Sequence, residues 1–309
     1  MTNSDDRRSS SKSGGSDRPV TGIVVGADGS ETSAAAVSFA ADMARSRDMS
    51  LHIVHALDFA PYGFGGPYMD AGGVYEWVEE GGKTILADAA KLARSIAPDV
   101  EVTTDLSIGS GAQWLVDLSE TARYIVLGAS DSGAAATALL LGNTAVNVTS
   151  HAHCPVVVVR GDERESGPVV VGVDGSDLSD AAVAAAFAEA SFRGATLLVV
   201  HVWSDLGPGL LEDPRASELV PDDLEQEETA VLAQALAGYQ EQYPDVTVER
   251  RFYVDNPRAR LEELSGEAQL IVVGSRGRGG FRGMLLGSTS NTLVGKSECP
   301  VMVVRPARD

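Results

Sequence analysis

A segment rich in glycine and arginine near the end of the chain has the residue types that bind phosphate. Residues 274–291 read GSRGRGGFRGMLLGSTSN. Glycines let backbone N–H groups converge on an anion, and a helix start rich in Ser and Thr adds hydroxyl groups and the positive end of the helix dipole. The part from 274 to 287 holds three arginines and no acidic residue. These features predict a polyphosphate site, and the alternative interpretation is a solvated basic loop without a ligand.

The rest of the chain is strongly acidic, which makes this basic segment distinctive. The 309 residues include 24 Lys and Arg against 44 Asp and Glu, a net charge of -20. Such a surface repels phosphate backbones and anionic lipid at long range, so general binding to nucleic acid or to a membrane surface is not expected. A phosphate ligand therefore needs a locally basic pocket.

An internal repeat sets the organisation of the chain. The sequence VVGADGS at 24–30 returns as VVGVDGS at 170–176, which is 146 residues later. The offset falls to 145 for Gly142, so one residue is unmatched between Gly128 and Gly142. Length and duplication predict two domains. The expected boundaries are a disordered, Ser-rich tail at 1–18, a first repeat at 19–161 and a second repeat at 162–309.

Alternating strand and helix patterns predict the fold of each repeat. In the second repeat, helix-length stretches at 179–192 and 222–243 lie between apolar runs bounded by turn residues. These runs predict strands at 169–173, 196–203, 247–254, 269–274 and 300–305. Strands that alternate with helices form parallel βαβ units. We therefore expect two tandem α/β domains, each a five-stranded, parallel, doubly wound, Rossmann-like sheet.

Both candidate ligand segments of the second repeat follow predicted strands. In open α/β sheets, ligands bind at the carboxyl ends of the strands, where the strand order reverses. The DGS turn at 174–176 follows the first strand, and the glycine-rich loop follows the fourth. We expect both to lie at this edge. A long loop is predicted at 60–73 and a short polar linker near 161–167.

The spacing of the glycines also carries a family resemblance. Gly274, two residues, Gly277, nine residues and then Gly287-Ser288 resembles the G-x2-G-x9-G-S/T signature of ATP-binding universal stress proteins. VGVDGS at 171–176, VVHVW at 199–203 and CPVMVV at 299–304 are similar to the same family. The resemblance covers both repeats, from about residue 19 to 306, and is to the tandem-domain members known from actinobacteria. It implies ATP as the ligand, with Mg²⁺.

The resemblance also implies roles for individual residues of the second repeat. Asp174, close to Gly172, would contact the nucleoside side of the ligand, Val202 would line the adenine pocket, and Asp205 would reach the ribose region. A short apolar side chain suits an adenine face, and backbone amides suit phosphates. The residues expected around the phosphates are Gly274, Ser275, Arg276, Gly277, Arg278, Gly279, Gly280, Gly287, Ser288 and Thr289.

The first repeat departs from the signature inside the phosphate loop. Asp131 stands at the position of the second glycine, ten residues precede Gly142 where the signature has nine, and Asn143 replaces Ser or Thr. A carboxylate facing a phosphate is repulsive, and the extra residue would displace the helix start. A weak or empty site is therefore predicted. Its residues would be Gly26, Asp28, Ala56, Gly128, Gly142 and Asn143.

The histidines and cysteines are interpreted as structural residues. His55 and His201 end equivalent strands, and a structural hydrogen bond is favoured over catalysis because no nucleophile motif accompanies them. No metal site is expected, because the sequence HAHC at 151–154 is not repeated at 296–299. The two cysteines are interpreted as small core residues, with a disulfide between them possible only if the final strands meet.

The residues favour a nucleotide-binding regulator over an enzyme. A dinucleotide oxidoreductase has its glycine fingerprint after the first strand, and a P-loop needs an upstream glycine that the GKS sequence at 295–297 lacks. No catalytic residue is assigned, since no general base is evident. The resemblance implies a role in stress response, growth or dormancy. The alternatives are a slow ATPase or nucleotide-handling enzyme, and a structural interaction module whose ATP is incidental.

Location and partners complete the expectations. No apolar run reaches the roughly 18 to 20 residues of a membrane span, and the first residues have no signal-peptide pattern, so a cytoplasmic location is expected. Family members pair domains through their last strands, which implies an internal pseudo-dimer here. A homodimer of whole chains and an unknown protein partner are further expectations.

Overall fold

The computed structural model describes most of both repeats. The described residues are 21–57, 74–129, 144–161, 164–203, 232–233, 236–277 and 285–305. Several predicted features lie outside them: the tail at 1–18, the loop at 60–73 and most of the helix at 222–243. The predicted site residues outside the described ranges are Asp205, Arg278, Gly279, Gly280, Gly142 and Asn143, together with Asp131.

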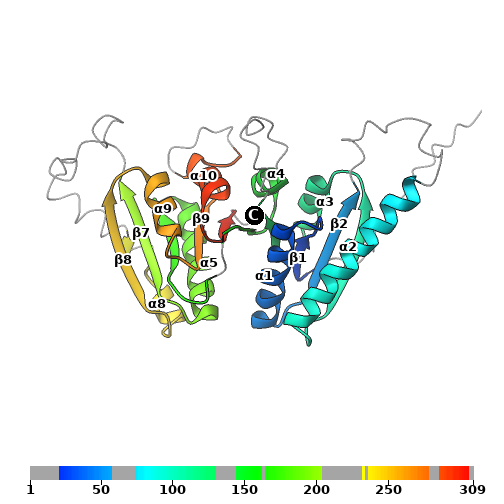
Figure 1. Cartoon of the computed structure of the whole chain (residues 1–309). Helices are drawn as coiled ribbons and strands as arrows, with labels where there is room; N and C mark the ends of the chain where they lie inside the picture. Colours follow the sequence, from blue (N-terminus) through cyan, green and yellow to red (C-terminus); the bar gives the residue numbers. More distant parts are fainter. Residues whose placement is uncertain are drawn as a thin grey trace, which may run out of the picture.

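Strands and helices alternate through both repeats (Figure 1). The first repeat contains β1 (Ile23–Gly26), α1 (Glu31–Arg47), β2 (Leu51–Leu57), α2 (Val74–Ile96), β3 (Val102–Ile108), α3 (Gly111–Leu118), β4 (Tyr124–Gly128), α4 (Thr144–His151) and β5 (Val156–Val159). The second repeat contains β6 (Val169–Val173), α5 (Asp177–Arg193), β7 (Leu197–Trp203), α8 (Tyr239–Gln242), β8 (Val248–Val254), α9 (Pro257–Ser265), β9 (Leu270–Gly274), α10 (Ser288–Lys296) and β10 (Val301–Val304). The five predicted strands of the second repeat are confirmed to within one residue at each end.

All ten described strands belong to one sheet, ordered β3-β2-β1-β4-β5-β10-β9-β6-β7-β8. Within each repeat every neighbouring pair is parallel, and the strand order reverses at the first strand, as the doubly wound fold requires. The last strands, β5 and β10, pair antiparallel and join the two halves. The pairing through the last strands that the resemblance implied is therefore present within this chain.

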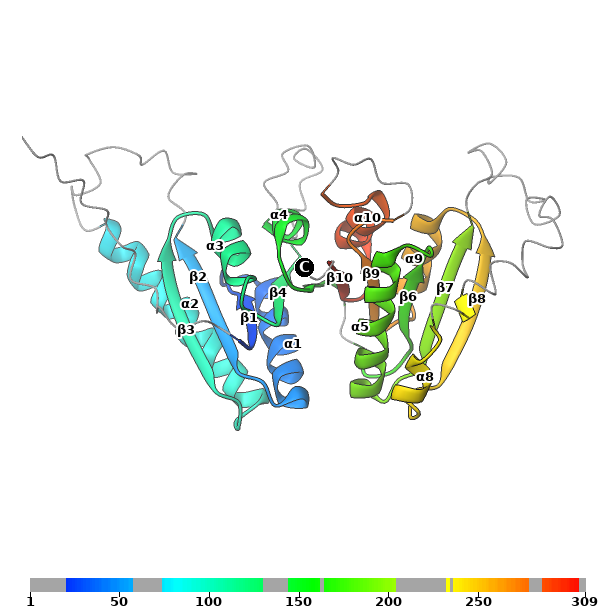
Figure 2. The same ribbon diagram turned by 180° about the vertical axis from the view of Figure 1, so that it is seen from behind.

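Helices cover both faces of the sheet, with the two halves side by side (Figures 1 and 2). Neighbouring residues of a strand enter opposite hydrophobic clusters: Val25 belongs to the cluster on the face covered by α1, α2 and α5, whereas Val24 belongs to the cluster on the face of α3, α4, α9 and α10. All four valines of β5 are buried. Continuous apolar strands are what a sheet covered on both faces needs, which explains the valine runs in the sequence.

The termini of the helices follow from local sequence. Ser30 begins α1 by accepting a hydrogen bond from the Ser33 amide at 3.1 Å. Asn256 begins α9 in the same way, with Pro257 at the first helical position, where its missing N–H costs nothing. Gly194 ends α5 in the left-handed conformation, with φ of 59°, which favours glycine. Polar residues at the carboxyl ends of strands therefore both start helices and line the edge where a ligand would bind.

Candidate functional site

The DGS turn after β6 holds the Asp174 carboxylate in a fixed position. Its Oδ1 accepts hydrogen bonds from the Ser176 amide at 3.1 Å, the Ser176 hydroxyl at 2.6 Å and the Ser179 hydroxyl at 2.5 Å. Ser179 lies in the first turn of α5, so the strand, the turn and the helix start are tied together. One carboxylate oxygen of Asp174 thus stabilises the turn by accepting all three hydrogen bonds.

The other oxygen of Asp174 faces the glycine-rich loop. A Cβ built on Gly277 would overlap Oδ2 of Asp174. Real Cβ atoms do not make such contacts, so any side chain at 277 would displace the loop or the carboxylate. The two segments that sequence spacing singled out, 103 residues apart, therefore lie against each other, and the second glycine of the signature is needed at their contact.

The two ends of the glycine-rich loop are fastened to each other. The Gly287 amide donates to the Ser275 carbonyl at 2.7 Å, and the Ser290 hydroxyl donates to the Gly274 carbonyl at 2.7 Å. A Cβ on Gly287 would lie 3.3 Å from the Cα of Arg276, so the backbones approach closely there. This clasp places Gly274, Gly277 and Gly287 together with the start of α10. Gly287 is the N-cap residue of α10 and has no side chain to accept a hydrogen bond from the first turn. The first amides of a helix have no partners within the helix, so they are free to bind an anion.

Arg305, which follows the strand beside the glycine-rich loop, contacts the first repeat. Ser275, the residue before Arg276, donates its amide to the Val304 carbonyl at 2.8 Å. The residue after Val304 is Arg305, and burial together with the charge of Arg276 lowers the pKa of Arg305. Arg305 donates to the carbonyls of Thr149, at 3.0 Å, and Ser150, in the last turn of α4. A cation there is favourable because helix carbonyls point outward at this end.

The adenine side of the predicted site is half-buried and apolar. Val202 in β7 is partly buried and packs against the hydrophobic cluster on the α9 and α10 face. The preceding residue, His201, donates from Nδ1 to the Val173 carbonyl at 2.7 Å and stacks on Phe252 with ring centroids 5.9 Å apart. His55 makes the equivalent bond to the Ala27 carbonyl at 2.6 Å. The structural hydrogen bonds predicted for both histidines are confirmed.

The first repeat has the same Asp-Gly-Ser turn as the second, at the position predicted for the nucleoside side of its site. Oδ1 of Asp28 accepts from the Ser30 amide at 2.9 Å and the Ser30 hydroxyl at 2.5 Å. Burial opposes ionisation of Asp28, but hydrogen bonds from Ser30 and Ser33 outweigh it and lower the pKa of the carboxyl. Gly26, Ala56 and Gly128 lie at the ends of β1, β2 and β4, at the same edge. The phosphate side of this repeat falls outside the described residues.

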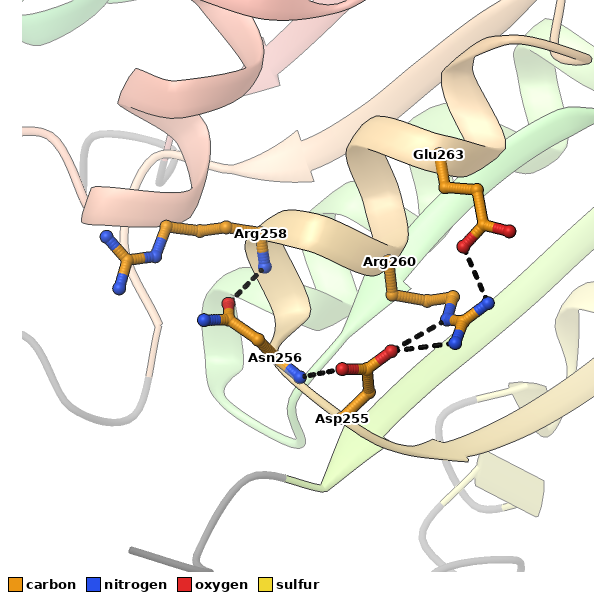
Figure 3. Close-up of polar contacts among 5 residues, drawn as sticks. All are labelled: Asp255, Asn256, Arg258, Arg260 and Glu263. Carbon is orange, nitrogen blue, oxygen red and sulfur yellow. Dashed lines mark hydrogen bonds and ion pairs between the residues drawn. The ribbon is translucent and has the colours of Figure 1, made fainter. Parts of the chain in front are cut away.

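Sequence reasoning missed the loop after the third strand of the second repeat (Figure 3). Oδ2 of Asp255 accepts from Arg260 at 2.7 Å, and Arg260 also donates to Glu263 at 2.7 Å. Arg258 instead extends away from this network toward α10. The same rule that placed the other segments, ligands at the carboxyl ends of strands, would have found this loop. It adds an exposed cation to the edge where α10 begins.

Two other candidate motifs have the following surroundings in the structure. The GKS letters at 295–297 lie at the C-terminal end of α10, where carbonyls and not amides are unpaired, so they are not a P-loop. His151 donates to the Asn147 carbonyl at 2.9 Å, and Nε2 of His153 is 3.9 Å from Glu120. Over the described ranges, no group of three or more His, Cys, Asp or Glu residues is placed to bind a metal ion. No helix among the same residues is long and apolar enough to cross a membrane.

Both cysteines are unpaired and buried although the last strands do meet. Burial raises the pKa of Cys154 to about 12 and also raises the pKa of Cys299. Since the thiolate is the reactive form, we expect both thiols of the folded protein to react with Ellman's reagent at pH 8 at least about 100-fold more slowly than after unfolding in guanidinium. Equal rates before and after unfolding would contradict their assignment to the core.

Comparison with known proteins places these features in one family. The model of the universal stress protein family matches residues 20–160 and 166–305, once in each repeat. A universal stress protein of Mycobacterium tuberculosis is 41% identical over 297 residues, covering 92% of this chain and 97% of the relative. One from Mycolicibacterium smegmatis is 41% identical over 295 residues, with 92% and 97% covered. The crystal structure of a universal stress protein from Archaeoglobus fulgidus matches with a TM-score of 0.66 at 22% identity, covering 92% of this chain and 96% of that one.

Proposed function

The chain belongs to the universal stress protein family, and we propose that it is a regulator whose second repeat binds ATP with Mg²⁺. The observation that supports this most strongly is the contact of Gly277 with Asp174 beside the clasp between Gly287 and Ser275. It gathers the signature glycines, a carboxylate and a helix start at one edge of the sheet. That arrangement suits a nucleotide, with phosphates at the backbone amides and nucleoside toward Asp174.

The described residues fit the proposed ligand in two further ways. The Ser275 hydroxyl is fully buried and has no hydrogen-bond partner among the described residues, so a polar ligand atom would satisfy it. The glycines leave a cradle that side chains would fill. Arg276 would contact the phosphates, Val202 the adenine, and Ser288 and Thr289 the phosphates at the start of α10. Asp205, Arg278, Gly279 and Gly280 complete the proposed set. Bound Mg²⁺ would neutralise phosphate charge.

Ligand binding would be communicated to the first repeat through the arginines. Arg276 and Arg305 repel each other, and Arg305 holds the end of α4. A phosphate group beside Arg276 would offset this repulsion and strengthen the hydrogen bonds from Arg305 to the carbonyls at the end of α4. The surface formed by α4 and α10 would then differ between the free and bound protein, which is how a protein partner in stress response, growth or dormancy would sense the nucleotide.

Thermal unfolding of the full chain with and without MgATP tests the proposed function. A ligand present at 100 times its Kd stabilises the folded state by about 2.7 kcal/mol. We therefore expect MgATP to raise the Tm by stabilising the folded chain. MgGTP should give a much smaller rise, because Val202 is proposed to line an adenine pocket and its apolar side chain offers no hydrogen-bond partner to the polar groups of guanine. A Tm that does not change with MgATP at millimolar concentration would contradict ATP binding.

The two alternatives make different predictions. A slow ATPase would release phosphate at a rate that Asp174→Ala abolishes while ATP binding survives. If the protein is an interaction module whose ATP is incidental, cells that carry a variant unable to bind nucleotide should grow normally under stress. We propose a regulator without turnover, in the cytoplasm. Association of whole chains would use a surface other than β5 and β10, because these strands are already paired within the chain.

Arg258 provides a test of the edge of the proposed site. Replacing it with alanine should weaken MgATP binding by about 3- to 10-fold, as expected for loss of one exposed cation near phosphate. Arg260→Ala, two residues away, removes a cation already paired with Asp255 and Glu263 and should change binding by less than about twofold. Titration calorimetry of the two variants distinguishes a local contact from a general charge effect. Equal losses in both variants would exclude a specific role for Arg258.

A further inference from the structure

The interface between the repeats is nearly symmetric in its backbone. Met302 pairs with Val157, and these two residues occupy equivalent positions of the repeats, 145 apart. The flanking pairs, Val301 with Val158 and Val303 with Val156, exchange under the same equivalence. A pseudo-twofold axis therefore passes through the Val157 and Met302 pair. Backbone pairing of this kind would serve two first repeats or two second repeats equally well.

A buried charge cluster lies across this interface. Arg47, at the end of α1, contacts Glu189 of α5 with Nη2 and Oε1 2.5 Å apart. Arg193 lies 3.4 Å from the other oxygen of Glu189. The side chains of Arg47 and Glu189 are 3% and 1% exposed. The Arg47 guanidinium also lies 4.4 Å from the Phe192 ring centre, and that of Arg193 lies 5.3 Å from Phe39.

The charges of the cluster are not symmetric, unlike the backbone. Arg47 and Arg193 are equivalent residues, 146 apart, and they converge on one carboxylate. The position equivalent to Glu189 in the first repeat is Met43, which is buried at 2% exposure. At this pair of equivalent positions, the second repeat has an acid and the first repeat has none.

We propose that the Arg47, Glu189 and Arg193 cluster selects the partner of the first repeat. Two first repeats paired through β5 would bury two copies of Arg47 with no carboxylate, and an unpaired buried charge is strongly unfavourable. Pairing with a second repeat supplies Glu189. The surface of the first repeat thus fits a domain that carries a carboxylate at this position, and rejects a second copy of itself. This inference does not depend on nucleotide binding.

Single-cysteine chains can measure this selectivity. Because the axis passes through positions 157 and 302, a lone Val157→Cys forms a disulfide between chains only when two first repeats meet. A lone Met302→Cys reports two second repeats in the same way. Antiparallel partners across a strand pair have Cα separations within the range that a disulfide spans. Both full-length chains would carry Cys154→Ala and Cys299→Ala, and the initial rate of disulfide dimer formation would be read on non-reducing gels.

The ratio of the 157 rate to the 302 rate is the decisive quantity, because any general opening of the interface raises both rates. We expect Arg47→Met to raise this ratio by roughly tenfold or more, since it removes the unpaired cation from a pair of first repeats. Met43→Glu should raise it similarly by giving the first repeat its own acid. Arg45→Met, which removes an exposed charge from the same helix, is the matched control and should leave the ratio unchanged. A ratio within about twofold of the parent in both Arg47→Met and Met43→Glu, with circular dichroism showing folded chains, would overturn the proposal.

Discussion

Replacing Gly277 with aspartate is expected to weaken MgATP binding to the full chain by about 100-fold or more, which is about 2.7 kcal/mol. The new Cβ would overlap Oδ2 of Asp174, so the loop or the carboxylate must move. The new side chain would also place a second carboxylate where phosphates are proposed to lie, and like charges a few ångströms apart repel by about 4 kcal/mol near a protein surface. Geometry and charge act in the same direction.

Gly295→Asp is the matched control for this change. Gly295 is exposed in α10, and a Cβ built on it meets nothing within 4 Å. The same chemical change there should alter MgATP affinity by less than about threefold, with only the small stability cost of a surface substitution. Competition binding with a fluorescent ATP analogue would compare the two variants. Equal affinity of Gly277→Asp and the parent chain would show that the loop does not hold the phosphates.

Replacing Phe187 with alanine is expected to lower the free energy of unfolding by about 3 to 5 kcal/mol. Phe187 is fully buried in α5 and stacks on Tyr239 and Tyr243, with ring centroids 5.4 and 5.8 Å apart. Removing the ring leaves a cavity that the two remaining tyrosine rings cannot fill. Because α5 carries Ser179 at the candidate site and Glu189 at the interface, its anchoring in the core supports both.

Urea unfolding followed by circular dichroism would measure this loss. Asp180→Ala, at an exposed position of the same helix, is the control and should cost less than about 1 kcal/mol, through weaker interaction with the helix dipole. If Phe187→Ala cost no more than Asp180→Ala, the described packing of α5 on the segment around 239–243 would be wrong.

Most of the fold could be predicted because its signals are local or repetitive. Valine runs such as 156–159 are typical of strands covered on both faces, and the offset of 146 residues, which becomes 145 from Gly142 onward, relates the elements of one repeat to those of the other. The contact between Asp174 and Gly277 followed from a general rule, that the carboxyl ends of parallel strands share one edge. His55 and His201 were correctly interpreted because a histidine at a strand end without a nucleophile has a neighbouring carbonyl as its simplest partner.

The features that sequence reasoning missed depend on distant residues. Arg47 and Glu189 are 142 positions apart, on helices of different repeats that the pairing of β5 with β10 brings together. The sequence does show the difference, since Arg47 matches Arg193 whereas Glu189 matches Met43. This difference in charge can be interpreted only when the position of the pseudo-twofold axis between the repeats is known. Arg258 was missed for a different reason: glycine motifs mark the loops after the first and fourth strands, whereas the loop after the third strand, DNPR at 255–258, has no such motif.

The two repeats agree in the turn after the first strand and in the last strand, and they differ in the loop predicted to bind phosphate. Asp28 and Asp174 make the same turn, and both last strands are buried. The loop predicted to bind phosphate is different: the first repeat has Asp131 at the position of Gly277, where an acidic side chain in the second repeat would lie against the carboxylate of Asp174. This difference predicts that one chain has one strong nucleotide site.

Calorimetric titration of the full chain with MgATP measures the number of strong sites most directly. We predict one saturable site per chain, which belongs to the second repeat and is lost in Gly277→Asp but kept in Gly295→Asp. Two equivalent sites per chain, or no saturable binding at all, would contradict the assignment of ATP binding to the second repeat alone.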